Sequence, residues 1–269
     1  MSYSGLVMDI DGTLYNSAKR ITEATRQAIF HAREAGKIIA IASGRPVPGI
    51  DDVCRRLELD EKGGYIMGWN GGRIFNAQTG EVISETCLPD GIVPEIATLA
   101  AEYDAPVEAQ TSDAIVSEQP DDPFIQLEAR LNHMTVDKIG SLADYTRHPI
   151  YKCIITGSDE KLVHLEQVAS RHFAGRLSVF RSEPYFLEIL PFGIDKAHAI
   201  DLLAEHLGLT HQDFIACGDG FNDLSMIRHA GLGVAMANAQ PVVRQNADYV
   251  TASCDEDGLV PVIEKFLLA

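Results

Sequence analysis

Two carboxylates, Asp9 and Asp11, follow an apolar run and precede a Gly-Thr turn in the segment LVMDIDGT. Carboxylates so close together repel each other, so both ionise freely only if a cation or a shared proton compensates their charge. The spacing therefore predicts a site in which such a group lies between the two side chains.

Two other short apolar runs also end in polar residues. IIAIA is followed by SGR at 43–45, and FIACG is followed by DGFND at 219–223. In open parallel sheets, ligands bind beyond the carboxyl ends of the strands, near the point where the strand order reverses. A single Asp at a strand end usually forms a turn or caps a helix. Three such carboxylates at a buried edge are costly without a cation, so we expect these three strand ends to share one site.

Strands alternating with amphipathic helices must position these residues. At both ends of the chain this alternation predicts an α/β fold with a doubly wound, mostly parallel sheet. TEATRQAIFHAREAG predicts a helix with Thr22 as N-cap and Gly36 at its end, and DKAHAIDLLAEHLG predicts another between Asp195 and Gly208. A further helix is expected from Pro48 to Leu57, and DFIACGDG, GLGVAM and ADYVT are expected to be buried strands.

The middle of the chain, from about Thr79 to about Glu183, differs in composition. It holds the clusters LPDG and SEQPDDP, the helical stretches GIVPEIATLAAEY and EKLVHLEQVASRHF, and the strand candidates YKCIITG and RLSVF. This pattern predicts a second α/β domain inserted into the first. We expect residues 1–82 and 186–269 to form a discontinuous core and residues 83–185 to form the inserted domain.

The composition argues against several classes of protein. The chain has 269 residues, 46% of them hydrophobic, and a formal net charge of −17. This acidic excess argues against binding to nucleic acid or to anionic lipid, because phosphate groups must be met by Lys and Arg. No apolar run approaches the ~20 residues of a membrane span, and no leader peptide is recognisable. We therefore expect a cytoplasmic protein without a membrane partner.

The cysteines and histidines show no metal-binding spacing. The five cysteines are scattered and none forms a CxxC pair, so neither a disulfide framework nor a thiolate zinc site is predicted. The nine histidines show no HxxxH or HExxH spacing, and we expect ordinary surface or core roles for them.

Four motifs in order, DIDGT, SGR, Lys196 and GDGFND, resemble those of the haloacid dehalogenase superfamily of phosphohydrolases. WNGG, FLEILPFGIDK, GVAMANA and ADYVTASCDEDGLV are similar to its Cof-type branch, which inserts a large α/β cap between the second and third motifs. The resemblance covers nearly the whole chain outside the inserted region. It implies a Rossmann-like core, Mg²⁺ as the cofactor and a phosphate monoester as the substrate.

The resemblance also implies a role for each matching residue. Asp9 is the expected nucleophile, forming an aspartyl-phosphate, and Asp11 is the expected general acid and base. Asp9, the backbone carbonyl of Asp11 and the carboxylate of Asp219 are the expected Mg²⁺ ligands. The groups expected to bind the phosphoryl oxygens are the backbone N–H groups of Ile10 and Gly44 and the side chains of Ser43, Lys196 and Asn222.

Supporting roles are expected around these residues. Thr13 should brace the loop, and Asp223 should support the metal site from behind. Asn70 and Asn238 also match positions of the family, but hydrogen bonding within local turns explains them equally well. We therefore leave both asparagines out of the predicted site.

Two residues depart from the pattern of the branch. Ala197 and Ala237 stand where that branch usually has Gly. Ala is the better helix former, so Ala197 is easily tolerated in its predicted helix. Ala237 would cost energy if its backbone needed a positive φ.

The resulting hypothesis is a magnesium-dependent phosphatase for small phosphorylated metabolites, with sugar phosphates as the substrate class. An inserted domain of about a hundred residues would cover the site, exclude water and keep out bulky phosphoproteins. Substrate identity is expected to depend on that domain, where Arg130, His133, Arg181 and Glu183 are equal candidates. The sequence does not indicate the oligomeric state.

Two alternatives stay open at this point. A phosphomutase or phosphotransferase passes the phosphoryl group of the same aspartyl-phosphate to a second hydroxyl, and no sequence feature separates it from a phosphatase. A phosphorylatable signalling module also combines acidic residues, a hydroxyl and a Lys around Mg²⁺ on a doubly wound sheet. The inserted domain and Asp11 argue against the signalling module, because a slow switch requires neither.

Overall fold

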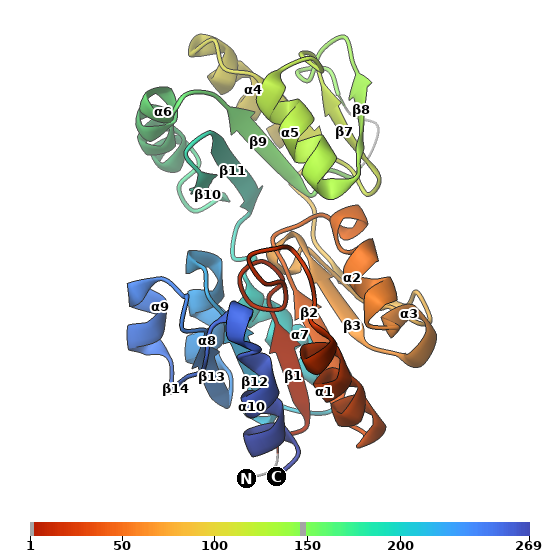
Figure 1. The fold of residues 1–269 in the computed structure, drawn as a ribbon. Helices are drawn as coiled ribbons and strands as arrows, with labels where there is room; N and C mark the ends of the chain where they lie inside the picture. The colour runs from red at the N-terminus through yellow and green to blue at the C-terminus, as the bar shows by residue number, and fades with distance from the viewer. Residues whose placement is uncertain (1–2, 146–148) are drawn as a thin grey trace. The chain divides into compact units, whose positions relative to one another are not determined.

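A computed structural model describes residues 3–145 and 149–269 (Figure 1). Contacts between residues divide the chain into two compact units, each with its own sheet and core. The first unit comprises the chain up to Gly44, Asp51–Glu85 and Asp195–Ala269, and the second comprises Arg45–Ile50 and Thr86–Ile194.

An eight-stranded sheet with the order β14-β13-β12-β1-β2-β3-β4-β5 forms the centre of the first unit. The strands from β14 to β3 run parallel, and β4 and β5 pair antiparallel at one edge. The predicted α/β class with a mostly parallel sheet is confirmed. The strands are β1 (Gly5–Met8), β2 (Ile38–Ala42), β3 (Tyr65–Gly68), β4 (Arg73–Asn76), β5 (Val82–Glu85), β12 (Phe214–Gly218), β13 (Leu232–Ala235) and β14 (Tyr249–Val250).

Helices cover both faces of this sheet. Val7 and Phe214 pack with apolar side chains of α7 and α8 on one face. The alternate residues Leu6 and Met8 point to the other face, where they are fully buried and where α1 and α10 lie next to each other (Figure 1). The helices are α1 (Glu23–Glu34), α2 (Asp51–Arg56), α3 (Leu59–Lys62), α7 (Lys196–His206), α8 (Leu224–His229), α9 (Pro241–Asn246) and α10 (Leu259–Val262), with 3₁₀ turns η2 (Trp69–Gly71), η3 (His211–Asp213), η4 (Phe221–Asp223) and η5 (Cys254–Glu256) and a π-helical turn η6 (Ile263–Leu267).

Local sequence signals set the ends of two of these helices. The side chains of Thr22 and Asp195 accept hydrogen bonds from backbone N–H groups in the first turns of α1 and α7. Gly36 and Gly208 follow the ends of these helices with φ angles of 79° and 68°. These predictions are confirmed. The helix predicted over 48–57 is instead a 3₁₀ turn, η1 (Val47–Gly49), followed by α2, because a Pro-Gly pair is a poor helix former.

The strand order reverses at β1. The chain adds β2 and β3 on one side of β1, and it adds β12, β13 and β14 on the other side. Met8, the last residue of β1, is level with Ile41 of β2 and with Cys217 of β12. The loops that follow β1 and β12 therefore meet where ligands bind in open α/β sheets.

The second unit has a six-stranded sheet with the order β10-β11-β9-β6-β7-β8, in which β7 and β8 run parallel and the other neighbours run antiparallel. Helices α4 and α6 pack with Val116 and Cys153 on one face, whereas α5 packs with Ile115, which points to the other face. The elements are β6 (Val107–Gln110), β7 (Ala114–Ser117), β8 (Thr135–Lys138), β9 (Lys152–Thr156), β10 (Leu177–Glu183), β11 (Phe186–Pro191), α4 (Ile92–Glu102), α5 (Pro123–Asn132) and α6 (Asp159–His172).

The boundary between the units falls later in the chain than the predicted domain limit. We expected residues from 186 onward to belong to the core, but β11 pairs with β9 and β10 of the second sheet. The second unit accordingly extends to Ile194. The apolar segment FLEILP suits either sheet, because a strand pattern does not specify which neighbouring strand it pairs with. That the second unit acts as a substrate-covering cap stays a prediction.

All five cysteines are free thiols, and two of them, Cys153 and Cys217, are fully buried. Burial raises the pKa of both thiols, so these side chains behave as small apolar core residues. Within residues 3–145 and 149–269, no helix combines the length and the apolar character needed to cross a membrane.

Candidate active site

A buried lysine joins two of the carboxylates that the sequence singled out. Asp9 directly follows β1 and is only 7% exposed, and Lys196, the first residue of α7, is fully buried. The Nζ atom of Lys196 donates hydrogen bonds to Oδ1 of Asp9 at 2.6 Å and to Oδ1 of Asp223 at 2.5 Å. Charge-assisted bonds this short hold all three side chains in place.

The electrostatics of this group favour a further cation. Burial and the nearby Asp223 raise the pKa of Asp9 to about 8, although Lys196 acts in the opposite direction. Burial and Asp223 also raise the pKa of Asp219 to about 6. Burial works against the charge of Lys196, but Asp223 and Asp9 outweigh it and raise the pKa of the ammonium group. One ammonium does not balance three carboxylates, so a divalent cation would relieve their repulsion.

The donor atoms present fit Mg²⁺. Carboxylate oxygens of Asp9, Asp219 and Asp223 lie within 4.8 Å of one another, and an all-oxygen set is what Mg²⁺ prefers. Asp223 is already committed, because its Oδ2 accepts the backbone N–H groups of Asp219 at 2.9 Å and Gly220 at 2.8 Å. Asp9 and Asp219 are therefore better placed than Asp223 to hold an ion directly, and the position of Asp223 suits the supporting role predicted for it.

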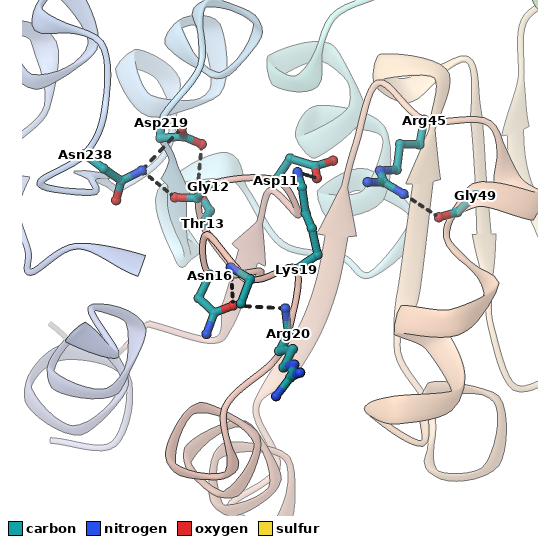
Figure 2. Close-up of polar contacts among 11 residues, drawn as sticks. Asp11, Gly12, Thr13, Asn16, Lys19, Arg20, Arg45, Gly49, Asp219 and Asn238 are labelled. Carbon is teal, nitrogen blue, oxygen red and sulfur yellow. Dashed lines mark hydrogen bonds and ion pairs between the residues drawn. The ribbon is translucent and has the colours of Figure 1, made fainter. Parts of the chain in front are cut away.

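The loop after β1 also contacts Asp219 (Figure 2). The hydroxyl of Thr13 donates a hydrogen bond to Oδ1 of Asp219 at 3.1 Å. Asn238 donates to the carbonyl of Gly12 at 2.8 Å and lies 3.5 Å from Oδ2 of Asp219. Gly12 has a φ of 78°, and a Cβ atom there would lie 2.3 Å from that same oxygen. Only glycine lets the two loops approach this closely.

Asp11 points to a different environment from Asp9. Its side chain is 38% exposed, and its Oδ1 accepts a hydrogen bond from Nζ of Lys19 at 2.7 Å (Figure 2). The two carboxylates of the DID segment thus each have their own lysine, one buried and one exposed. No sequence pattern pointed to Lys19, which lies in a polar turn eight positions after Asp11.

Three of the predicted phosphate-binding residues lie around Asn70. The carbonyl of Ser43, which follows β2, accepts the backbone N–H of Asn70 at 2.8 Å. Nδ2 of Asn222 donates to Oδ1 of Asn70 at 3.1 Å. A Cβ atom on Gly44 would lie 3.2 Å from that same Oδ1 and 3.6 Å from Nδ2 of Asn222. Asn70, which we left out of the predicted site, therefore connects the second motif to the fourth.

The remaining predicted positions have ordinary surroundings. Ile10 is fully buried, and its carbonyl accepts the backbone N–H of Tyr15 at 2.7 Å. Ala197 lies in the first turn of α7. Ala237 is exposed and is not among the described residues with positive φ, so the absence of glycine there causes no backbone strain.

The polar residues of the second unit that are candidates for substrate recognition differ in the contacts that they already make. Arg181 forms ion pairs with Asp159 and with Glu166 of α6, so its guanidinium is held by its own unit. His133 is the C-cap residue of α5 and has a φ of 54°, so termination of this helix already explains its position. Any role of these residues in substrate recognition stays a prediction.

This doubly wound sheet, with acidic loops after β1 and β12 and a buried lysine at the start of α7, defines a phosphohydrolase of the haloacid dehalogenase type. A model of the haloacid dehalogenase-like hydrolase family matches residues 6–263, and the chain belongs to this family. The predicted family and fold are thereby confirmed, and the chain is a hydrolase of phosphoric monoesters.

Two solved structures and a curated phosphatase are similar to this chain over nearly its whole length. A haloacid dehalogenase-like hydrolase from Bacteroides thetaiotaomicron is 41% identical, with a TM-score of 0.91 over 98% of this chain and 99% of that one. The subclass IIB sugar phosphatase BT4131 is 26% identical, with a TM-score of 0.78 over 97% and 98% of the two chains. The HMP-PP phosphatase of Serratia proteamaculans is 27% identical over 98% of this chain and 96% of its own.

Proposed function

We propose that this protein is a Mg²⁺-dependent phosphatase that hydrolyses small phosphate monoesters through an aspartyl-phosphate on Asp9, with sugar phosphates as the substrate class. The observation that carries the proposal is the buried contact of Lys196 with Asp9 and Asp223 beside Asp219. The sugar phosphatase BT4131 and the HMP-PP phosphatase support a small phosphorylated substrate.

Asp9 and Asp219 would hold Mg²⁺, together with the backbone carbonyl of Asp11. When bound, the ion neutralises negative charge on the phosphoryl group, which lets an anionic nucleophile approach a dianion. Thr13, Asn238 and Asp223 keep Asp219 and its loop in position by the hydrogen bonds described above. Lys196 orients the Asp9 carboxylate by holding its Oδ1.

In the first step, a carboxylate oxygen of Asp9 attacks phosphorus and the bond from phosphorus to the leaving alcohol breaks. Asp11 donates a proton to the leaving oxygen. In the second step, Asp11 takes a proton from water as the water attacks phosphorus, which releases inorganic phosphate and restores Asp9. The exposed position of Asp11 suits exchange of this proton with solvent.

The phosphoryl oxygens would be bound by hydrogen-bond donors from all four motifs. The hydroxyl of Ser43, the backbone N–H of Gly44 and the amide of Asn222 are the proposed donors, with Asn70 holding the amide in place. The side chain of Lys196 and the backbone N–H of Ile10 complete this set.

The decisive experiment measures phosphate release from sugar phosphates, nucleotides and pyridoxal phosphate, with and without Mg²⁺. Asp9→Asn should lower release by more than about a thousandfold, since losing a covalent nucleophile removes the reaction path itself. Asp90→Asn, which changes an exposed aspartate of the second unit, is the control and should act like the wild type.

The same panel separates the alternatives. Conversion of one sugar phosphate into its isomer with little free phosphate would replace the phosphatase by a mutase. A phosphoaspartate that persists for minutes after the phosphodonor is removed would replace it by a signalling module. A wild type that releases no phosphate from any compound would contradict the proposal.

A further inference from the structure

Two histidines and an aspartate that have no part in the proposed mechanism converge on the surface of the first unit. Oδ1 of Asp201 lies 2.7 Å from Nε2 of His229 and 3.3 Å from Nδ1 of His211. The centroids of the two imidazole rings lie 4.0 Å apart, and the ring planes are tilted by 32°. All three ligand atoms lie within 4.8 Å of one another, which is close enough for a single ion.

The three residues come from three different elements that the fold holds together. Asp201 lies in the middle of α7, His211 begins η3, and His229 ends α8. The backbone N–H of Gly231, just after α8, donates to the carbonyl of His211 at 3.0 Å. A Cβ atom on Gly231 would lie 2.0 Å from the carbonyl oxygen of Gln212, so the two turns are in tight contact. The positions of both histidine backbones are therefore fixed before any ligand arrives.

The distances suit a tetrahedral ion. Bonds of about 2.0–2.1 Å to nitrogen and oxygen place neighbouring ligands of a tetrahedral Zn²⁺ at roughly 3.3 Å from each other. The separation of His211 and Asp201 already equals that value. The separation of Asp201 and His229, now 2.7 Å, would open by about 0.6 Å as the hydrogen bond is replaced by two metal bonds.

The exposure and chemistry of the ligands select the ion. The side chains of Asp201, His211 and His229 are 47%, 34% and 30% exposed, so solvent can supply the fourth ligand. Imidazole nitrogens suit Zn²⁺, Cu²⁺ or Ni²⁺, whereas Mg²⁺ requires oxygen ligands. The net charge of −17 also favours cation binding.

We propose that Asp201, His211 and His229 form a binding site for a transition-metal ion of the zinc class, which clamps α7, η3 and α8 together. Lys196 begins α7 and Asp223 immediately precedes α8, so the clamp joins the middle of α7 to the far end of α8, the two helices that start at the Lys196–Asp223 pair. The ion would stabilise the frame of the phosphatase site without taking part in its chemistry.

The test is isothermal titration calorimetry of the full chain with ZnCl₂ in excess MgCl₂, together with the melting temperature. We expect one equivalent of Zn²⁺ to bind and to raise the melting temperature. Loss of a group that only orients a metal ligand typically costs about 10–100-fold in affinity. His211→Ala and His229→Ala, which each remove a ligand, should therefore weaken binding by at least about tenfold.

Three further variants make the result specific. Asp201→Asn keeps a hydrogen-bond acceptor for both rings but loses the anionic ligand, so it should fold normally and bind Zn²⁺ more weakly. His31→Ala, an exposed histidine on α1, should bind like the wild type. Asp219→Asn should also keep its binding, which shows that the ion is not at the acidic site. Equal affinity in all variants, or no binding by the wild type, would overturn the proposal.

Discussion

At the scale of single residues, the two aspartates of the DID segment lie in different surroundings, which suit the two roles proposed for them. Asp9 is buried against Lys196, whereas Asp11 is partly exposed beside Lys19. A nucleophile benefits from a fixed, desolvated position, and a general acid and base benefits from exchange with water. Different surroundings, rather than different chemical groups, separate the proposed roles.

The role of Asp11 can be tested with leaving groups of different quality. Asp11→Asn should lower phosphate release from a sugar phosphate by about 10²–10⁴-fold, because an alkoxide leaves poorly without a proton. The first burst of nitrophenolate from an aryl phosphate should be much less affected, because that group leaves without protonation. Stopped-flow absorbance measures the burst, and an equal loss with both substrates would argue against Asp11 as the acid.

Gly12 offers a second test at this scale. Gly12→Ala places a methyl group against Oδ2 of Asp219, so we expect at least a tenfold weaker apparent Mg²⁺ affinity in phosphatase assays, about 1.4 kcal/mol. Gly36→Ala is the matched control, because Gly36 has nearly the same φ, 79°, with no atom within 4 Å of the added Cβ. Gly36→Ala should lose only about 1 kcal/mol of stability, from the strained φ, and should keep its Mg²⁺ affinity. The same Mg²⁺ response in both variants would show that contact with Asp219 is unimportant.

At the scale of elements, the sheet of the second unit carries a buried polar cluster. Nζ of Lys152 on β9 lies 3.3 Å from Oε2 of Glu188 on β11 and 3.8 Å from Oε1 of Glu128 on α5. Gln110 on β6 donates hydrogen bonds to Glu128 at 3.1 Å and to Glu108 at 2.9 Å. Burial and the nearby Glu128 raise the pKa of Glu108 well above its usual range. One ammonium thus joins α5 to the sheet.

Removing this ammonium should destabilise the second unit. Lys152→Met leaves Glu128 and Glu188 buried without a cation, which should cost about 3–5 kcal/mol. Lys161→Met is the control, because Lys161 is a partly exposed lysine whose Nζ donates to a backbone carbonyl, that of Asp104, and the change should cost less than about 1 kcal/mol. The shift of the urea midpoint measures both effects. Equal shifts would mean that the cluster contributes no more than a surface contact.

At the scale of the whole molecule, stability should depend jointly on pH and on Mg²⁺. The pKa values of Asp219, about 6, and Asp9, about 8, lie above the unfolded value of about 3.9. Between the unfolded and folded pKa values, Asp9 and Asp219 bind more protons in the folded chain than in the unfolded chain. The contribution of these two groups to the free energy of unfolding therefore falls as the pH rises from about 4 to about 8.

Mg²⁺ should reverse this loss, because it binds ionised carboxylates in the folded state only. We expect the rise in melting temperature on replacing EDTA by MgCl₂ to be larger at pH 8 than at pH 5. Differential scanning calorimetry measures it, and Asp219→Asn should respond weakly at both pH values. An equal or larger rise at pH 5 would contradict the proposed metal ligands.

Local patterns determined much of this protein. The apolar runs predict β1, β2 and β12, and Thr22 and Asp195 mark the starts of α1 and α7, because capping and hydrophobic periodicity act over a few residues. The order of the four motifs identified the family. Since parallel strands align their carboxyl ends, the sequence also indicated that the loops after these strands share one edge of the sheet.

Only the tertiary structure decided which side chains meet. The contacts of Lys196 with Asp9, of Asn222 with Asn70 and of Asn238 with the loop after β1 join residues more than a hundred positions apart. Lys19 beside Asp11 depends on the path of a polar turn that no periodic pattern describes.

Two further features depend on contacts between distant elements, which sequence spacing could not predict. The strand β11 belongs to the second sheet, and the cluster of Asp201, His211 and His229 draws its members from three elements. Sheet order, strand register and helix packing set these distances. They arise from the burial of the whole core, so a local pattern determines which elements form, and the assembled core determines which of their side chains come within reach.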